Sequence, residues 1–297
     1  MHPPAADVFT TVNIVAALLT LIPFLFVGFF PQWAARIRRL PIWAQLAGPA
    51  ALCIPYVLVA CGDGIFRWNW CALYLIFPVA IAALLWQAAQ IDPGQRGNWR
   101  DFLVLAVLGP AVDLRWFEGA WPPHLAIFNK ILLLDAGIYA LVLIRGLEGT
   151  GFDLRLRLSD LGIGLRETAL YTPIALVLGL GLGFLHTHRG WPGLGPIAVA
   201  WLFTFFFIAV PEELFFRGWL QNLLEKRLGR YGALIVTACL FGLAHFNKRA
   251  THFNWRYVLL AALAGIFYGR AWRARRRVGA SAVTHATVDT IWSLWLR

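Results

Sequence analysis

Ten apolar runs, several of them as long as a bilayer is thick, constrain the fold of this chain more than any other feature. A helix that crosses the hydrocarbon core needs about 20 consecutive apolar residues, and the first run, residues 8–30, has this length. The other runs are residues 42–61, 71–90, 102–112, 125–144, 168–185, 197–216, 232–246, 257–271 and 281–296. We predict an all-α, polytopic integral membrane bundle with about 8–10 transmembrane helices, in which the short run 102–112 is a re-entrant segment or a half-helix.

The composition supports a membrane protein and argues against nucleic-acid binding. The chain is 60% hydrophobic and 14% charged, whereas a soluble domain has about 25% charged residues. The net charge of +11 comes mainly from arginines in short loops between the apolar runs. Because these arginines form no single basic face, we read them as topology signals and expect no nucleic-acid partner. The four cysteines lie in or beside apolar runs, which indicates buried hydrophobic residues and no disulfide framework.

Loop charges predict the orientation of the helices. If every run crosses the membrane, the loops on one side carry 17 Lys and Arg residues and the loops on the other side carry 6. The positive-inside bias then places the richer side in the cytoplasm. The N-terminus lacks the basic region of a signal peptide, so we expect the first run to be a retained helix. These features predict a multi-pass cell-membrane protein, and the Arg-, Ala- and Trp-rich composition suggests a bacterial inner membrane.

A charged segment divides the chain. Residues 151–160 alternate charged and apolar side chains, a pattern that is typical of a strand. Beside a membrane we expect an extended linker or a surface-lying piece instead. It separates N-terminal transmembrane helices of unassigned role, residues 1–150, from a C-terminal membrane core, residues 161–297.

The densest polar cluster in an apolar run is Pro211-Glu212-Glu213, followed by Arg217. Glu213 and Arg217 are four residues apart with the acid first, which is the favourable order for an ion pair on one helix face. Glu212 lies about 100° from Glu213 around the helix axis and is outside this pair. The structural alternative is an ordinary helix start, with proline at its first position and acids on the helix dipole.

A glycine-rich basic turn, residues 229–232, predicts a helical hairpin. Glu212 is 18 residues before residue 230 and His245 is 15 residues after it, so both lie about 22–27 Å from the turn. An antiparallel hairpin brings this carboxylate and this imidazole to a similar depth, where they make a water-activating pair. The alternative is that His245 has no catalytic role and is a lone histidine of an apolar helix with its hydrogen bonds satisfied within the protein.

The last apolar run carries a second polar pair. His285 and Asp289 are separated by four residues and share one helix face. A carboxylate that holds an imidazole fixes its tautomer and orients the ring, so that His285 can polarise a carbonyl or hold an oxyanion. A hydrogen bond that only packs helices together is the alternative.

These three motifs, in this order on hydrophobic helices, resemble the CPBP family of CAAX proteases and bacteriocin-processing enzymes. The matching elements are Glu-Glu-x-x-x-Arg at 212–217, Phe-x-x-x-His at 241–245 and His-x-x-x-Asp at 285–289. The resemblance covers about residues 160–297 and includes the type II CAAX prenyl endopeptidases. It implies an intramembrane endopeptidase, and it implies nothing about residues 1–150.

The resemblance also implies roles for individual residues. Glu212 is the implied base that activates water, with help from His245, and Glu213 with Arg217 is the implied supporting pair. His285 and Asp289 resemble the residues that stabilise the oxyanion in the family. Asp289 departs from members that have asparagine there. Because an ionised Asp cannot donate a hydrogen bond, Asp289 is either protonated or only orients His285.

We expect no cofactor, because a glutamate-activated water needs only the residues already named. A divalent metal such as zinc is the alternative, with Glu212, His245 and His285 as its ligands, although the chain has no His-Glu-x-x-His motif.

The expected substrate is a membrane protein or a lipidated peptide, processed at a C-terminal tail or a leader. Two rival functions stay open. A non-catalytic membrane scaffold or immunity protein would keep these residues for packing, and a transporter would use the same buried charges but show inverted repeats.

Overall fold

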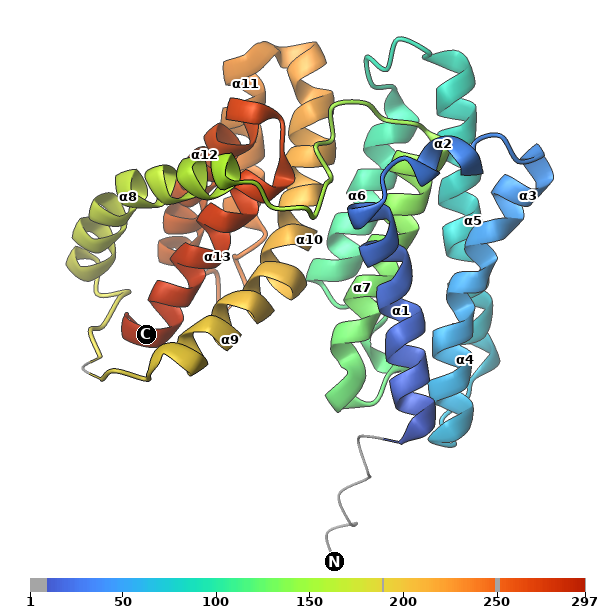
Figure 1. Ribbon diagram of the computed structural model, residues 1–297, viewed down its shortest axis with the longest axis horizontal. Coiled ribbons are helices and arrows are strands. Elements are labelled where there is room, and N and C mark those ends of the chain that lie inside the picture. Colours follow the sequence, from blue (N-terminus) through green and yellow to red (C-terminus); the bar gives the residue numbers. More distant parts are fainter. Residues whose placement is uncertain (1–9, 189, 249–251, 297) are drawn as a thin grey trace, which may run out of the picture. The chain divides into compact units, whose positions relative to one another are not determined.

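The computed structural model describes residues 10–188, 190–248 and 252–296. Within these ranges every regular element is a helix and none is a β-strand. The chain forms two compact units, Met1–Glu148 and Gly149–Arg297, which run from blue to green and from yellow-green to red in Figure 1. The predicted all-α, polytopic class is confirmed.

The first unit consists of seven α-helices and four shorter 3₁₀- or π-helical pieces among its described residues. They are α1 (Thr11–Phe29), α2 (Trp33–Ile37), α3 (Ile42–Ala47), η1 (Gly48–Leu52), α4 (Cys53–Gly62), α5 (Trp68–Ile91), α6 (Trp99–Asp113), η2 (Glu118–Ala120), η3 (Pro123–Leu125), α7 (Ala126–Gly137) and η4 (Ile138–Ile144). Hydrogen bonds join buried polar groups at its centre, where the Tyr74 hydroxyl accepts from Nε1 of Trp121 at 2.6 Å and donates to Oδ1 of Asn129 at 2.7 Å.

The second unit carries all the motif residues. Its described elements are α8 (Leu158–Gly181), α9 (Leu194–Thr204), η5 (Phe205–Ala209), α10 (Val210–Glu213), η6 (Leu214–Gln221), α11 (Asn222–Leu243), α12 (Trp255–Arg275) and α13 (Val278–Trp295). Helix α13 packs against both α8 and α12, and α11 packs along α12. These contacts gather the motif residues of α10, η6, α11 and α13 in one place.

The hairpin that the glycine-rich turn predicts is present. Gly229 has φ 71° and ψ 176°, which breaks α11 into two helical pieces and reverses the chain (Figure 1). A positive φ of this size is cheap for glycine because it has no Cβ. One arm of the hairpin runs from α10 through η6 into the start of α11, and the other arm is the rest of α11.

Two glycines of α12 pack in the groove between these arms, and each contacts a residue from both. Gly265 lies beside Arg217 and Ala238, and Gly269 lies beside Gln221 and Leu234. In each case the two partners are equally distant along the chain from a point between residues 227 and 228, just before Gly229. The same symmetry sets Glu212 level with Leu243, two residues before His245. The two groups therefore lie at a similar depth, as the spacing predicts.

Six segments of the described residues are long and apolar enough to cross a membrane by length and composition. They are Thr11–Phe29, Ile42–Gly62, Trp68–Ile91, Pro123–Ile144, Leu158–Gly181 and Leu194–Leu243. The sixth has 50 residues and contains both arms of the hairpin. The run at 102–112 lies in α6, which is not among these six. The expected total of eight to ten crossings stays a prediction.

Two details of the predicted elements were wrong. Helix α8 begins at Leu158, so residues 158–160 are helical and do not belong to the extended segment. The reason is a helix start in which Asp160 accepts from the backbone N–H of Arg157 at 3.0 Å. The run at 42–61 is not one regular helix, because the 3₁₀ turn η1, which contains Pro49, interrupts it.

Candidate active site

The motif that begins at Pro211 lies in an irregularly wound helix. The four-residue helix α10 is flanked by the π-helical pieces η5 and η6. Proline has no backbone N–H, so Pro211 removes one donor from the helical ladder. Single turns of π-helix inside α-helices frequently occur at functional sites. Here η5 ends three residues before Glu212, and η6 begins directly after Glu213.

Glu213 lies at the centre of the polar cluster. Its Oε1 accepts from Nη1 of Arg217 at 3.0 Å and from Nδ1 of His285 at 2.8 Å. The side chains of Glu213 and Arg217 are completely buried and that of His285 is 3% exposed. The structure therefore contains the ion pair that the four-residue spacing predicts. It adds His285 as a second partner, which the spacing of the motifs does not reveal.

Arg217 is held from several sides. Its Nη2 donates to the carbonyl oxygen of Gly265 at 3.0 Å. Its guanidinium lies 4.6 Å from the ring centroid of Phe241 and 5.4 Å from that of Tyr268. Aromatic faces attract cations, so these rings help a buried charge that has no contact with water. The arginine therefore neutralises Glu213 and is not exposed to a substrate.

His285 directs one ring nitrogen to the buried pair and the other to two partly exposed carboxylates. Because the Glu213 carboxylate can only accept, Nδ1 of His285 carries the hydrogen. On the opposite side of the ring, Nε2 lies 3.5 Å from Oδ2 of Asp289 and 3.9 Å from Oε2 of Glu212. The side chains of Glu212 and Asp289 are 29% and 31% exposed. Tyr268 stacks on the imidazole at 4.7 Å with an interplanar angle of 15°.

His245 lies just after the end of α11 and is fixed by a hydrogen bond to that helix and by two aromatic rings. Its Nδ1 donates to the carbonyl oxygen of Phe241, four residues earlier, at 2.8 Å. Its ring centroid lies 4.9 Å from that of Phe241 and 4.8 Å from that of Tyr257. With the hydrogen on Nδ1, Nε2 of a neutral ring is an acceptor. Both Glu212 and Asp289 lie within electrostatic range of His245.

A cavity of about 80 Å³ opens beside this cluster. Its lining includes His245, His285 and Asp289, and most of its other lining residues are apolar. Most of the apolar residues that line the cavity belong to α8, to residues 184–185 and to one face each of α12 and α13. The three motifs alone do not reveal the walls contributed by α8 and by residues 184–185.

One part of the cavity wall could have been found from the sequence. The α12 residues that line it lie at helical spacing along one face, at positions 257, 260, 261, 264 and 268. This is the i, i+3, i+4, i+7 pattern of a helix face. Tyr257 and Tyr268 lie at the two ends of this stripe, the residues between them are aliphatic, and both tyrosines contact a motif histidine.

The geometry does not match a metal site. Among the residues that the structure describes, no group of three or more His, Cys, Asp or Glu side chains is arranged to hold a metal ion. The possible ligands Glu212 and His285 lie near each other, but Nδ1 of His285 is already bonded to Glu213. We therefore derive no step through a metal.

Residues 149–157, which we call the strap, attach the start of the second unit to the helix that carries His285. The backbone N–H of Val278, the first residue of α13, donates to the carbonyl of Gly151 at 2.9 Å. Nε1 of Trp272 donates to the carbonyl of Thr150 at 3.1 Å. Gly151 has φ +71°, and a Cβ there would come within 2.1 Å of the carbonyl oxygen of Arg276. Only glycine fits this approach.

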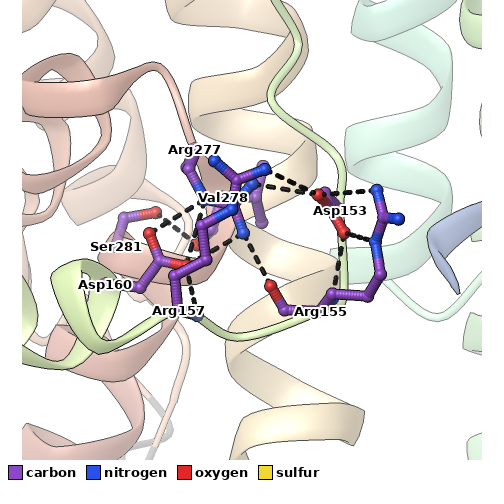
Figure 2. A network of polar contacts seen from close by, with 7 residues as sticks. All are labelled: Asp153, Arg155, Arg157, Asp160, Arg277, Val278 and Ser281. Atoms are coloured by element: carbon purple, nitrogen blue, oxygen red, sulfur yellow. Dashed lines mark hydrogen bonds and ion pairs between the residues drawn. The ribbon is translucent and has the colours of Figure 1, made fainter.

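Charged groups reinforce the strap. Figure 2 shows the guanidinium of Arg277 between the carboxylates of Asp153 and Asp160. It contacts Asp153 at 3.0 Å and Asp160 at 2.9 Å, and it also donates to the carbonyl of Arg155 at 2.8 Å. Asp153 accepts in addition from Nε of Arg155 at 2.8 Å. Because α13 begins at the next residue, this network fixes the end of the helix that carries His285.

The strap gives a pH-dependent stability. Burial opposes ionisation of Asp153, but the hydrogen bonds from Arg155 and Arg277 outweigh it and lower its pKa to about 2. An unfolded Asp has a pKa of about 3.9. The stabilisation is therefore present above about pH 4 and is lost as the pH falls to about 2.

Asp153→Asn tests this directly through the unfolding temperature in detergent as a function of pH. We expect the wild type to unfold at a higher temperature than the variant at neutral pH, and the difference to vanish as the pH falls through about 2. A difference that stays constant with pH would mean that the charge of Asp153 does not contribute.

The fold and the cluster define a multi-pass helical membrane protein with a buried carboxylate–histidine site that borders an apolar cavity. Comparison with known proteins adds one match, to a family model. The model of the Rce1-like type II CAAX prenyl endopeptidases matches residues 194–291. This segment contains all six motif residues and confirms the resemblance to the CAAX proteases. No curated protein and no solved structure matches the chain.

Proposed function

We propose that the protein is an intramembrane endopeptidase in which Glu212 activates water for attack on a peptide bond of a membrane-associated protein or lipidated peptide. The matched family is one of peptide hydrolases. The observation that carries the proposal is the difference between the two adjacent glutamates. Glu213 is completely buried and bonded to Arg217 and His285, whereas Glu212 is partly exposed and faces Nε2 of the same histidine.

In the proposed reaction Glu212 takes a proton from water while the water oxygen attacks the scissile carbonyl carbon. The carbonyl oxygen gains the negative charge, and an N–H at Nε2 of His285 stabilises it. When the tetrahedral intermediate collapses, the carbon–nitrogen bond breaks and Glu212 returns the proton to the leaving amine. The products are one new carboxylate and one new amine.

Four residues support this chemistry in the proposal. Glu213 holds the hydrogen on Nδ1 of His285, and Arg217 holds Glu213 in place. Asp289, as a carboxylate 3.5 Å from Nε2, favours a proton on that nitrogen and acts by orienting His285. His245, with its acceptor Nε2, assists the transfer of the water proton to Glu212.

The apolar cavity supports a substrate that reaches the site from the bilayer. Helix α8 contributes Tyr171, Thr172 and Leu176 to its wall, and the outer face of α8 is exposed at apolar residues such as Val177, which is 72% exposed. The cavity thus lies behind a helix that faces lipid. We propose that the protein works in a bacterial inner membrane and that no cofactor takes part.

His245→Ala tests the proposal against a non-catalytic scaffold. Wild-type protein in lipid vesicles should cleave membrane-anchored reporter peptides, and cleavage in water labelled with oxygen-18 should place the label in the new carboxylate. The variant should lose about a hundredfold or more of this rate, which is the lower range for removal of an acid–base group. His252→Ala, at an exposed histidine of the following loop, is the matched control. An undiminished rate in His245→Ala would contradict the mechanism.

A further inference from the structure

A cluster of arginines lies at the end of the second unit away from the cavity mouth, where two elements meet. Arg230 follows the Gly229 turn of α11, and Arg273 lies in the last turn of α12. Nη1 of Arg273 donates to the backbone carbonyl of Arg230 at 2.6 Å. Arg276, directly after α12, adds a third guanidinium.

The cluster has more positive than negative charge. The nearby carboxylate of Glu225 is bonded to Nη2 of Arg276 at 2.5 Å. In the described part of the chain, neither Arg230 nor Arg273 forms an ion pair with a carboxylate, and Nε of Arg273 is buried without a hydrogen-bond partner. Arg230 and Arg276 lie within electrostatic range of Arg273, and their like charges repel it. A bound anion would relieve this repulsion.

The length of α12 sets the depth of the cluster. The helix has 21 residues and is therefore about 31 Å long, close to the thickness of the hydrocarbon core of about 30 Å. Trp255, which is 50% exposed, begins the helix, and tryptophan favours the bilayer interface. With Trp255 at one interface, Arg273 and Arg276 reach the headgroups of the opposite leaflet.

Apolar side chains surround the charges. Leu228 and Tyr231, on either side of the Gly229 turn, are 49% and 75% exposed. The guanidinium of Arg273 lies 5.7 Å from the ring centroid of Tyr231. Exposed tyrosine and leucine beside arginine suit a membrane interface, where acyl chains and phosphate groups adjoin. A soluble phosphate would use the arginines and leave these side chains in water.

We propose that Arg230 and Arg273, flanked by Leu228 and Tyr231, form a binding site for the phosphate headgroup of an anionic phospholipid. The two guanidinium groups bind the phosphate, and the two apolar side chains contact the upper part of the acyl chains. This site is independent of peptide cleavage. It anchors the Gly229 turn, and through it the hairpin that carries Glu212 and His245, to one leaflet.

Thermal unfolding of the whole protein in neutral detergent, titrated with short-chain lipids, tests the proposal. Dioctanoyl phosphatidylglycerol should raise the unfolding temperature of the wild type in a saturable way, whereas the zwitterionic phosphatidylcholine and inorganic phosphate should not. The double variant R230Q/R273Q should bind phosphatidylglycerol about 30-fold more weakly, since each arginine near an anionic headgroup contributes about fivefold. R230K/R273K, which keeps both charges, should retain most of the binding.

Two controls separate this site from general charge effects. R36Q/R256Q removes two exposed arginines outside the cluster, each of which lies over a tryptophan, and should bind phosphatidylglycerol like the wild type. An equal loss in R36Q/R256Q, or no loss in R230Q/R273Q, would overturn the proposal. Stabilisation by inorganic phosphate equal to that by phosphatidylglycerol would overturn it as well, because it would indicate a site for a soluble anion.

Discussion

Glu212→Gln should lower the rate of peptide cleavage by on the order of 10³-fold without reducing the amount of folded protein. Glutamine keeps the shape of the side chain but cannot accept a proton from water. Because the Glu212 side chain is 29% exposed and lies outside the buried ion pair, its neutralisation should cost little stability. The measurement is the initial rate on a membrane-anchored reporter peptide, compared at equal amounts of folded protein.

The matched control for this experiment is Glu118→Gln. Glu118 is a surface glutamate of the first unit, paired with Arg115 at 3.4 Å, and the same chemical change there should leave cleavage unaltered. Wild-type activity in Glu212→Gln would refute Glu212 as the base. A loss of folded protein in Glu212→Gln would show instead that the side chain supports the fold.

Arg217→Met should be the most destabilising single substitution in the site. It leaves the carboxylate of Glu213, which has no exposed surface, without its cation. Removing one member of a buried ion pair costs about 3–5 kcal/mol, because the remaining charge stays desolvated and unpaired. We expect a loss of this size in the free energy of unfolding in detergent. Cleavage should also be lost, because Arg217 no longer holds Glu213 in place for its hydrogen bond with His285.

The double variant E213Q/R217M separates charge from packing. It removes both members of the pair, so the cost of an unpaired buried charge disappears and part of the lost stability should return. Arg256→Met, at an exposed arginine at the start of α12, should be nearly neutral. If E213Q/R217M were as unstable as the sum of its single substitutions, the ion pair would not account for the effect.

Local spacing predicts the parts of the site that lie on one helix or on one hairpin. Glu213 and Arg217 pair at four residues, and His285 and Asp289 do so less closely at 3.5 Å. The Gly229 turn produces the hairpin that brings Glu212 and His245 to one depth. In each case the distance between the two residues follows from local chain geometry, which is either the helical repeat or the single reversal at Gly229.

Contacts between separate helices could not be read in the same way. The hydrogen bond from His285 to Glu213 depends on how far α13 is shifted along the hairpin. That shift depends on close packing at glycines such as Gly164, where α8 approaches Val283 of α13. The π-helical pieces around Glu212 and Glu213 have no sequence pattern of their own, apart from the proline between them.

The strap gives the protein a mechanical link that variant studies will have to take into account. It is the only covalent route from the first unit to the second, and it is fastened to the end of α13 two helical turns before His285. A displacement of the strap, or a bulky residue at Gly151, would shift α13 along its axis. The imidazole of His285 would then be misaligned. Substitutions in the strap should therefore inactivate the protein even though every residue of the active site is unchanged, because they shift His285 relative to Glu213.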